Sequence, residues 1–279
     1  MVVTRNIEAA RRAVAERCGV PVDVRIRRVP FLLEPQYPDD PEFVEVHLDR
    51  MTRRLGKLVG AAGISKWAEL DAKERDDLLE VIRSRKNCGA NAHNLALHER
   101  GELVGINFTT RQDEVIEKTV ENRINTTTVP SHRLVRWASR FGRSEEVFAI
   151  VNRKHFEEGA TLNNRKMLSE AAAEAGLDRI AALEYLASDE DLQAVRDEAE
   201  HARMMMQKVG AGCAIPYAIV GDQKSSRVQG AQEPEVFAAI FAGIVDPDGA
   251  LARKVAEGRP RPAPAAEEGV PPTLVAAVC

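Results

Sequence analysis

Cysteine is scarce and scattered in this chain of 279 residues. It has four cysteines, none of them in a CxxC pair or at a Cys/His spacing suited to zinc, so the sequence predicts neither a metal site nor a disulfide framework. This use of cysteine is typical of a reducing compartment, and we expect a cytoplasmic protein. The four residues are Cys18, Cys88, Cys213 and Cys279.

Long apolar runs and a strong excess of charge are also missing. No run approaches the roughly 18 apolar residues of a membrane span, and the first residues, MVVTRNIEAARRAVAER, contain no apolar signal core. The net charge of -4 provides no field that would attract polyanions. We therefore expect neither a membrane nor a nucleic acid as a partner. Aromatic residues make up only 5% while alanine is abundant, which favours helices over sheets.

The first part of the chain has patterns of both helices and strands. Apolar residues recur at helical spacing over residues 5–18 and alternate with polar residues over 22–28, which predicts a helix followed by a strand. Amphipathic helices are expected over 44–62 and over 71–86, the second with Asp71 as its N-cap.

Helical patterns dominate the middle of the chain and then give way to strands. Residues 131–211 have the pattern of consecutive helices with short breaks. Two segments with strand patterns, 217–221 and 226–230, are separated by a polar turn and predict a β-hairpin, which a helix through Ile244 follows. Residues 247–279 are biased towards proline and alanine, and we expect this tail to be disordered.

This order of elements predicts an α/β fold in which a large, mostly helical insertion interrupts a sheet domain. Residues 1–30 form the first part of the sheet domain, 31–206 the insertion and 207–246 the second part, before the tail of 247–279.

Pro216 directly precedes a predicted strand, at a position where it removes one backbone donor from the sheet. If the Ile215–Pro216 bond were cis, a tight turn would present the backbone of Ile215 to a bound peptide or thiol compound. The plain alternative is an ordinary loop proline, since few X-Pro bonds in folded proteins are cis.

Residues 210–237, GAGCAIPYAIVGDQKSSRVQGAQEPEVF, resemble the C-terminal thioredoxin motif of the DsbA-like family. This family includes FrnE-type oxidoreductases, 2-hydroxychromene-2-carboxylate isomerases and kappa-class glutathione transferases. Residues 5–35, 124–139 and 154–177 resemble further parts of it, so the resemblance covers most of 1–246. The Gly-Ala-Gln form of residues 230–232 is similar to the FrnE-like branch.

The resemblance implies a thioredoxin-like fold, a cis Pro216 and a set of substrate-binding residues. For Asn125 the alternative role is ordinary loop capping, and for His132 it is a structural one. Cys213 is a weak candidate thiol, because a free cysteine is more often a small buried hydrophobe. The binding residues that the resemblance implies are Ile215, Pro216, Asn125, His132 and Gln232.

The chain departs from the family at the catalytic position. The family's CxxC follows a first strand and opens the first helix, where the helix dipole stabilises a thiolate. Here no cysteine precedes Cys18, which falls at the end of that helix, so we expect the first strand and the CxxC to be absent and Met1 to be an internal start. Neighbouring strands lie about 4.8 Å apart, so the loss would leave an unstable gap between the strands at 22–28 and 217–221.

Three functions follow from the resemblance. The first is a FrnE-like thiol-disulfide oxidoreductase, whose catalytic dithiol this chain lacks and whose partner is a thiol or disulfide protein or peptide. The second is a glutathione-dependent isomerase or transferase, with glutathione as cosubstrate. The third is a catalytically inactive peptide-binding or scaffold protein whose sheet a partner chain completes by strand addition. We expect no resident cofactor or metal, and the sequence leaves a homodimer open.

Overall fold

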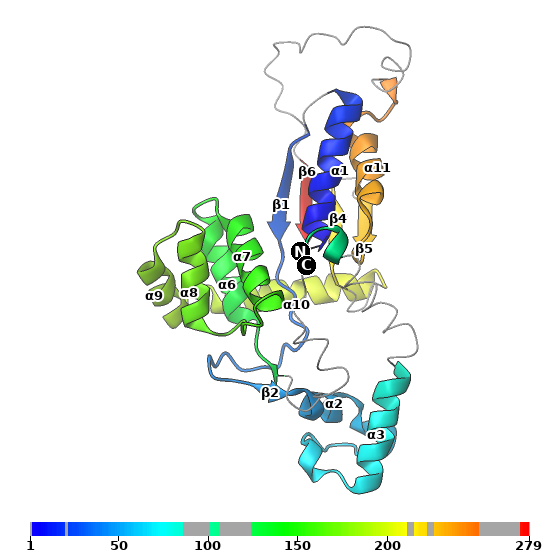
Figure 1. The fold of residues 1–279 in the computed structure, drawn as a ribbon, viewed down its shortest axis with the longest axis vertical. Helices are drawn as coiled ribbons and strands as arrows, with labels where there is room; N and C mark the ends of the chain where they lie inside the picture. The colour runs from blue at the N-terminus through cyan, green and yellow to red at the C-terminus, as the bar shows by residue number, and fades with distance from the viewer. Residues whose placement is uncertain are drawn as a thin grey trace. The chain divides into compact units, whose positions relative to one another are not determined.

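A computed structural model describes most of the chain, and its residues group into two compact units that we treat separately (Figure 1). The sheet unit comprises Met1–Leu33 and Gln193–Cys279, and the helical unit comprises Glu34–Leu192. The insertion was expected to end at residue 206, but the helical unit ends at Leu192, because the helix Leu192–Lys208 belongs almost wholly to the sheet unit. The described residues are 2–19, 22–85, 101–106, 124–210, 215–221, 226–250 and 274–278.

The sheet unit contains a four-stranded sheet in the order β1-β6-β4-β5. The predicted hairpin is present, with β4 and β5 antiparallel. Helices α1 and α11 pack side by side (Figure 1), and Ala10, Phe237 and Phe241 are fully buried. The elements are α1 (Val2–Cys18), β1 (Val24–Arg28), α10 (Leu192–Lys208), β4 (Tyr217–Val220), β5 (Ser226–Gln229), α11 (Pro234–Val245) and β6 (Leu274–Val278).

Strand β6 lies in the middle of the sheet and corrects two of our expectations. It runs parallel to β1, from Val24 opposite Leu274 to Arg28 opposite Val278, and antiparallel to β4. The sheet therefore has no gap, and disorder was the wrong prediction for Leu274–Val278. The bias of the whole tail hid a short apolar run whose backbone supplies the donors and acceptors that β1 and β4 would otherwise lack. Residues 251–273 lie outside the described residues.

A buried asparagine ties α1 to the loop that follows β5. Asn6 is 3% exposed, and its Nδ2 donates to the carbonyl oxygen of Gln232 at 2.8 Å. The loop begins at Gly230, whose φ of 79° favours glycine and whose N–H donates to the carbonyl of Pro216 at 2.8 Å. The start of β4 and the end of β5 are thereby fixed against α1.

The helical unit begins with a small subdomain built around α2 and α3. The helix expected over 44–62 is shorter than predicted, because α2 ends at Leu55 and a 3₁₀ turn follows it. A Cβ on Gly56 would lie 2.9 Å from the carbonyl oxygen of Ala61, so glycine allows the chain to turn back at this point. Its elements are β2 (Glu45–Val46), α2 (His47–Leu55), η1 (Gly56–Val59), η2 (Trp67–Glu69) and α3 (Ala72–Arg85).

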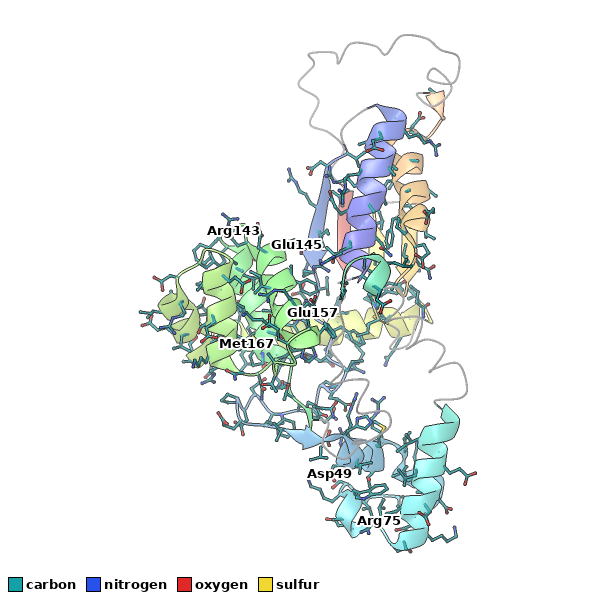
Figure 2. The ribbon with its side chains drawn as sticks, in the orientation of Figure 1. Asp49, Arg75, Arg143, Glu145, Glu157 and Met167 are labelled. Carbon is teal, nitrogen blue, oxygen red and sulfur yellow. The ribbon has the colours of Figure 1, made fainter. Side chains whose placement is uncertain are left out.

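Side chains join these short elements (Figure 2). Asp49 of α2 accepts from the backbone N–H of Trp67 at 2.9 Å, and Arg75 of α3 donates to the carbonyl of Ala68 at 2.9 Å. Asp71 caps α3 as predicted, because its Oδ1 accepts from the N–H of Glu74 at 2.8 Å while the Glu74 carboxylate accepts from the N–H of Asp71 at 2.9 Å.

Four helices form the larger part of the helical unit. Leu134, Leu168 and Leu186 are fully buried where these helices pack together. Asp178 caps the last helix, with its side chain accepting from two backbone N–H groups. The helices are α6 (Val129–Ser139), α7 (Ser144–Phe156), α8 (Arg165–Glu174) and α9 (Arg179–Ala187), and the short strand β3 (Ile124–Asn125) pairs with β2.

Arg133 of α6 closes the end of α9. It is 4% exposed, and its guanidinium donates to the carbonyls of Tyr185, Ser188 and Glu190 at 3.0, 2.6 and 2.9 Å. The last carbonyls of a helix have no partner within the helix, and this buried arginine donates to one of them, Tyr185, and to two carbonyls of the turn that follows α9.

Replacing Asn6 should loosen the loop after β5. We expect Asn6→Ala to lower the free energy of unfolding by about 1–2 kcal/mol, because the Gln232 carbonyl loses its partner. Urea denaturation would measure the loss, and hydrogen exchange should rise at 230–232. Glu16→Ala, on the exposed side of the same helix, is the matched control. Equal stability of the two variants would contradict the structural role of Asn6.

Replacing Arg133 should destabilise the four-helix part of the helical unit. We expect Arg133→Met to cost about 2–4 kcal/mol, since several buried carbonyls lose charge-assisted hydrogen bonds together. Arg136→Met is the control on the same helix, because Arg136 is 43% exposed and its ion pair with Asp191 lies near the surface. That change should cost less than about 1 kcal/mol. A similar urea midpoint for both variants would show that the buried hydrogen bonds contribute little.

Candidate functional site

The peptide bond between Ile215 and Pro216 is cis, as the resemblance implied, and it directly precedes β4. The side chain of Ile215 is 36% exposed. Within the described residues, no hydrogen bond is made by the backbone N–H or C=O of Ile215. These two groups are therefore available to pair with an extended chain.

Three strands place this bond at the end of the sheet where β1 and β6 finish and β4 begins. Val278 lies opposite Ala218 in β4 and opposite Arg28 in β1, so β1 and β6 end where β4 begins. We call this the Pro216 edge, formed by Arg28, Ile215, Pro216 and Val278. The guanidinium of Arg28 donates to Oγ1 of Thr4, in the first turn of α1, at 2.8 Å. The edge thus combines open backbone groups with a cation.

The buried side chains behind this edge hold it in place. Tyr217, next to Pro216, packs with Phe31, Ala202 and Met206 in one apolar cluster. Arg203 stacks over the Phe31 ring at 5.2 Å and donates to the carbonyl of Leu32. Because all of these residues belong to the sheet unit, the start of β4 has a rigid support.

Gln232 lies close to the Pro216 edge through the bond from Gly230 to Pro216. Its side chain is exposed, and its Nε2 donates to the carbonyl of Gln229 at 2.8 Å. The structure therefore brings Ile215, Pro216 and Gln232 together. Their role in substrate binding stays a prediction.

Asn125 and His132 belong to the helical unit, and both make contacts within it. The side chain of Asn125 accepts from Arg50 at 3.2 Å and donates to the carbonyl of Glu45 at 3.4 Å. The backbone N–H of His132 donates to the carbonyl of Thr128 in the first turn of α6. Their binding roles also stay predictions.

The charged groups around Asn125 neutralise one another. Burial raises the pKa of Glu34, but hydrogen bonds from Arg50 and Arg53 outweigh it and hold that pKa below 4.5. The same balance of burial against Arg53 lowers the pKa of Glu45, while burial and the Glu45 carboxylate raise the pKa of Tyr37. Paired carboxylates and a protonated phenol are suited to structural support rather than to proton transfer at neutral pH.

Cysteines contribute little to the described structure. Cys18, at the end of α1, is a buried free thiol. Cys213, our weak candidate, lies outside the described residues, as do Cys88 and Cys279. In the part of the chain that the structure covers, no cluster of three His, Cys, Asp or Glu residues could hold a metal ion. None of the described helices is both long and apolar enough to cross a membrane.

Two residues that the sequence analysis missed support the candidate site. Asn6 sits among the apolar residues of α1, at the same helical spacing as Ala10 and Val14, and a polar residue at such a position is the signal that could have found it. Arg28 gave no signal, because it is one of several arginines in and beside β1. Only the pairing of the strands shows that it lies at the Pro216 edge.

Comparisons with known proteins agree with this geometry. A family described as DSBA-like thioredoxin domain matches residues 77–242, more than half of the chain. Among solved structures, the chain is similar to a probable DsbA oxidoreductase from Streptomyces coelicolor, with a TM-score of 0.54 and 22% identity over 94% of this chain and 86% of that chain. No curated protein matches.

The thioredoxin-like fold with a large helical insertion is thereby confirmed. The chain belongs to the DsbA-like thioredoxin domain family, a family of the thiol-disulfide oxidoreductase type.

Proposed function

We propose that the Pro216 edge binds an extended thiol or disulfide peptide. We further propose that this chain supplies the substrate-binding part of a thiol-disulfide oxidoreductase of the FrnE-like branch. The observation that carries the proposal is the exposed Ile215 directly before β4, whose backbone N–H and C=O have no partner among the described residues. An extended peptide gains main-chain hydrogen bonds when it pairs with such open groups, here beyond the start of β4. A disulfide in that peptide would lie beside the ends of β1 and β6.

In the proposed chemistry, a thiolate attacks one sulfur of the substrate disulfide and the other sulfur leaves as a thiolate. A second thiol then attacks the mixed disulfide and releases the reduced substrate, so the two thiols become one disulfide. This sequence contains no CxxC pair. We therefore assign substrate binding to the residues of this chain, and the dithiol that attacks the substrate is not among them.

The loop after β5 supports the FrnE-like branch. Its Gly230-Ala231-Gln232 sequence has a physical basis in the fold, because Gly230 has a positive φ, Ala231 is 7% exposed and the Gln232 carbonyl is held by Asn6. The positive φ favours glycine at 230 and the burial favours a small residue at 231, while Asn6 holds a backbone carbonyl that any residue at 232 would supply.

A glutathione-dependent isomerase or transferase is the second candidate. Arg28 favours it, because its position at the end of β1 places a positive charge, bonded to Thr4, near the Pro216 edge, and a positive charge suits the carboxylates of a tripeptide that pairs with Ile215. Calorimetric titration with glutathione separates the two candidates. Saturable binding of glutathione without binding of longer disulfide peptides would favour the second.

Removing the N–H of Ile215 should weaken peptide binding. We expect Ile215→Pro to raise the dissociation constant of a fluorescently labelled disulfide peptide roughly tenfold, the equivalent of one hydrogen bond of about 1.4 kcal/mol. Fluorescence anisotropy would measure it. Ile215→Val keeps the N–H and a similar side chain, so it should bind as the parent does. If both variants bound equally well, the peptide would not pair with this residue.

Dithiol exchange by this chain should be negligible. In an insulin reduction assay with a dithiol reductant, we expect no acceleration beyond the uncatalysed rate, because no CxxC pair is present to form and resolve a mixed disulfide. Rapid turnover that Cys213→Ala abolishes would refute this expectation and assign the chemistry to Cys213. Cys18→Ala, which changes the buried thiol, is the control.

A further inference from the structure

The central strand of the sheet comes from a segment far along the chain from the strands that it joins. All five residues of β6 pair with β1, and Ala276, Ala277 and Val278 also pair with β4. Without β6, the strands β1 and β4 would stand about 9.6 Å apart, twice the usual spacing, with unpaired backbone groups. The position between β1 and β4 is therefore a strand-accepting slot that must be filled for the sheet to be continuous.

The segment in this slot is suited to binding as a strand. Its sequence, LVAAV, is wholly apolar, as is typical of a strand inside a sheet with both faces covered. It carries no charged side chain, so its placement requires no ion pair with the rest of its own chain. What β1 and β4 offer it is backbone pairing, which a second copy offers equally.

The connection to β6 is long enough to reach another molecule. In the sequence, residues 251–273 separate the last described residue of the preceding segment, Ala250, from the first residue of β6, Leu274. If fully extended, those residues could span up to about 75 Å, since each residue adds at most about 3.3 Å. A globular chain of this size has a radius of gyration of only about 19 Å. The segment can therefore reach the same slot in a second copy.

We propose that this protein forms dimers by exchanging β6, so that Leu274–Val278 of each copy fills the slot between β1 and β4 of the other. Exchange keeps every strand pairing that the single chain has, and identical elements are exchanged in this way at little energetic cost. A tethered strand competes with its equivalent in another molecule at an effective concentration on the order of millimolar. Dilute protein is therefore monomeric, and dimers form when the chain refolds at high concentration.

A pair of introduced cysteines reports which chain supplies β6. Ile219 lies opposite Ala277 in the register of β4 and β6, and Cβ atoms of facing residues lie about 4.5–5.5 Å apart, close to the spacing of a disulfide. Full-length chains carrying both Ile219→Cys and Ala277→Cys are made in light and heavy isotope forms. The two forms are mixed in denaturant, refolded together at high concentration, oxidised and digested for mass spectrometry.

Complete exchange gives as many mixed heavy-light crosslinks between the two introduced cysteines as uniform ones. Refolding at a hundredfold lower concentration should lead to loss of the mixed crosslinks. The single variant Ala277→Cys shows which crosslinks involve the native cysteines. Adding Ala276→Pro, which interrupts β6, should abolish the crosslink, whereas adding Ala265→Pro in the proline-rich stretch should leave it unchanged.

Only uniform light-light and heavy-heavy crosslinks after refolding at high concentration would overturn the proposal. No crosslink between the two introduced cysteines would overturn the strand pairing on which it rests. Light scattering on the unmodified chain adds a test that needs no variant, because the mass should double as the refolding concentration rises, and a constant monomer mass would also refute exchange. None of these outcomes depends on peptide binding at the Pro216 edge.

Discussion

Backbone hydrogen bonding between β6 and its two neighbours is the constraint on which the sheet unit depends. Unpaired donors and acceptors in a sheet interior are costly, and since β1 and β4 lie two strand spacings apart, a strand between them must pair with both. Leu274–Val278 meets this requirement through pairing on both sides. The same pairing brings the ends of β1 and β6 to the start of β4, which creates the Pro216 edge.

A few buried polar contacts then fix the parts that apolar packing leaves undetermined. Asn6 holds the Gln232 carbonyl, and Gly230 bonds to Pro216, so the loop after β5 has one conformation against α1. In the helical unit, Arg133 does the same for the end of α9. Each contact satisfies backbone carbonyls that the regular elements leave without a partner, which is why single polar side chains at these positions matter.

The functional proposal separates substrate recognition from thiol chemistry. Recognition needs an extended backbone with free donors and acceptors, and Ile215 supplies these next to a cis proline. Thiol exchange needs an accessible thiolate, and the one cysteine within the described residues, Cys18, is buried at the C-terminal end of α1. Membership of the DsbA-like family is consistent with both substrate recognition and thiol exchange. The geometry of this chain supports substrate recognition.

The sequence by itself determined the local elements, from the helix at α1 and the hairpin of β4 and β5 to the cap at Asp71, because periodicity and capping act between residues a few positions apart. It also determined the family, through the motif around Pro216. Only the tertiary structure decided that Leu274–Val278 is the central strand, that Asn6 holds the loop after β5 and that Arg28 reaches the Pro216 edge. These depend on contacts between distant segments, whose partners no local pattern identifies.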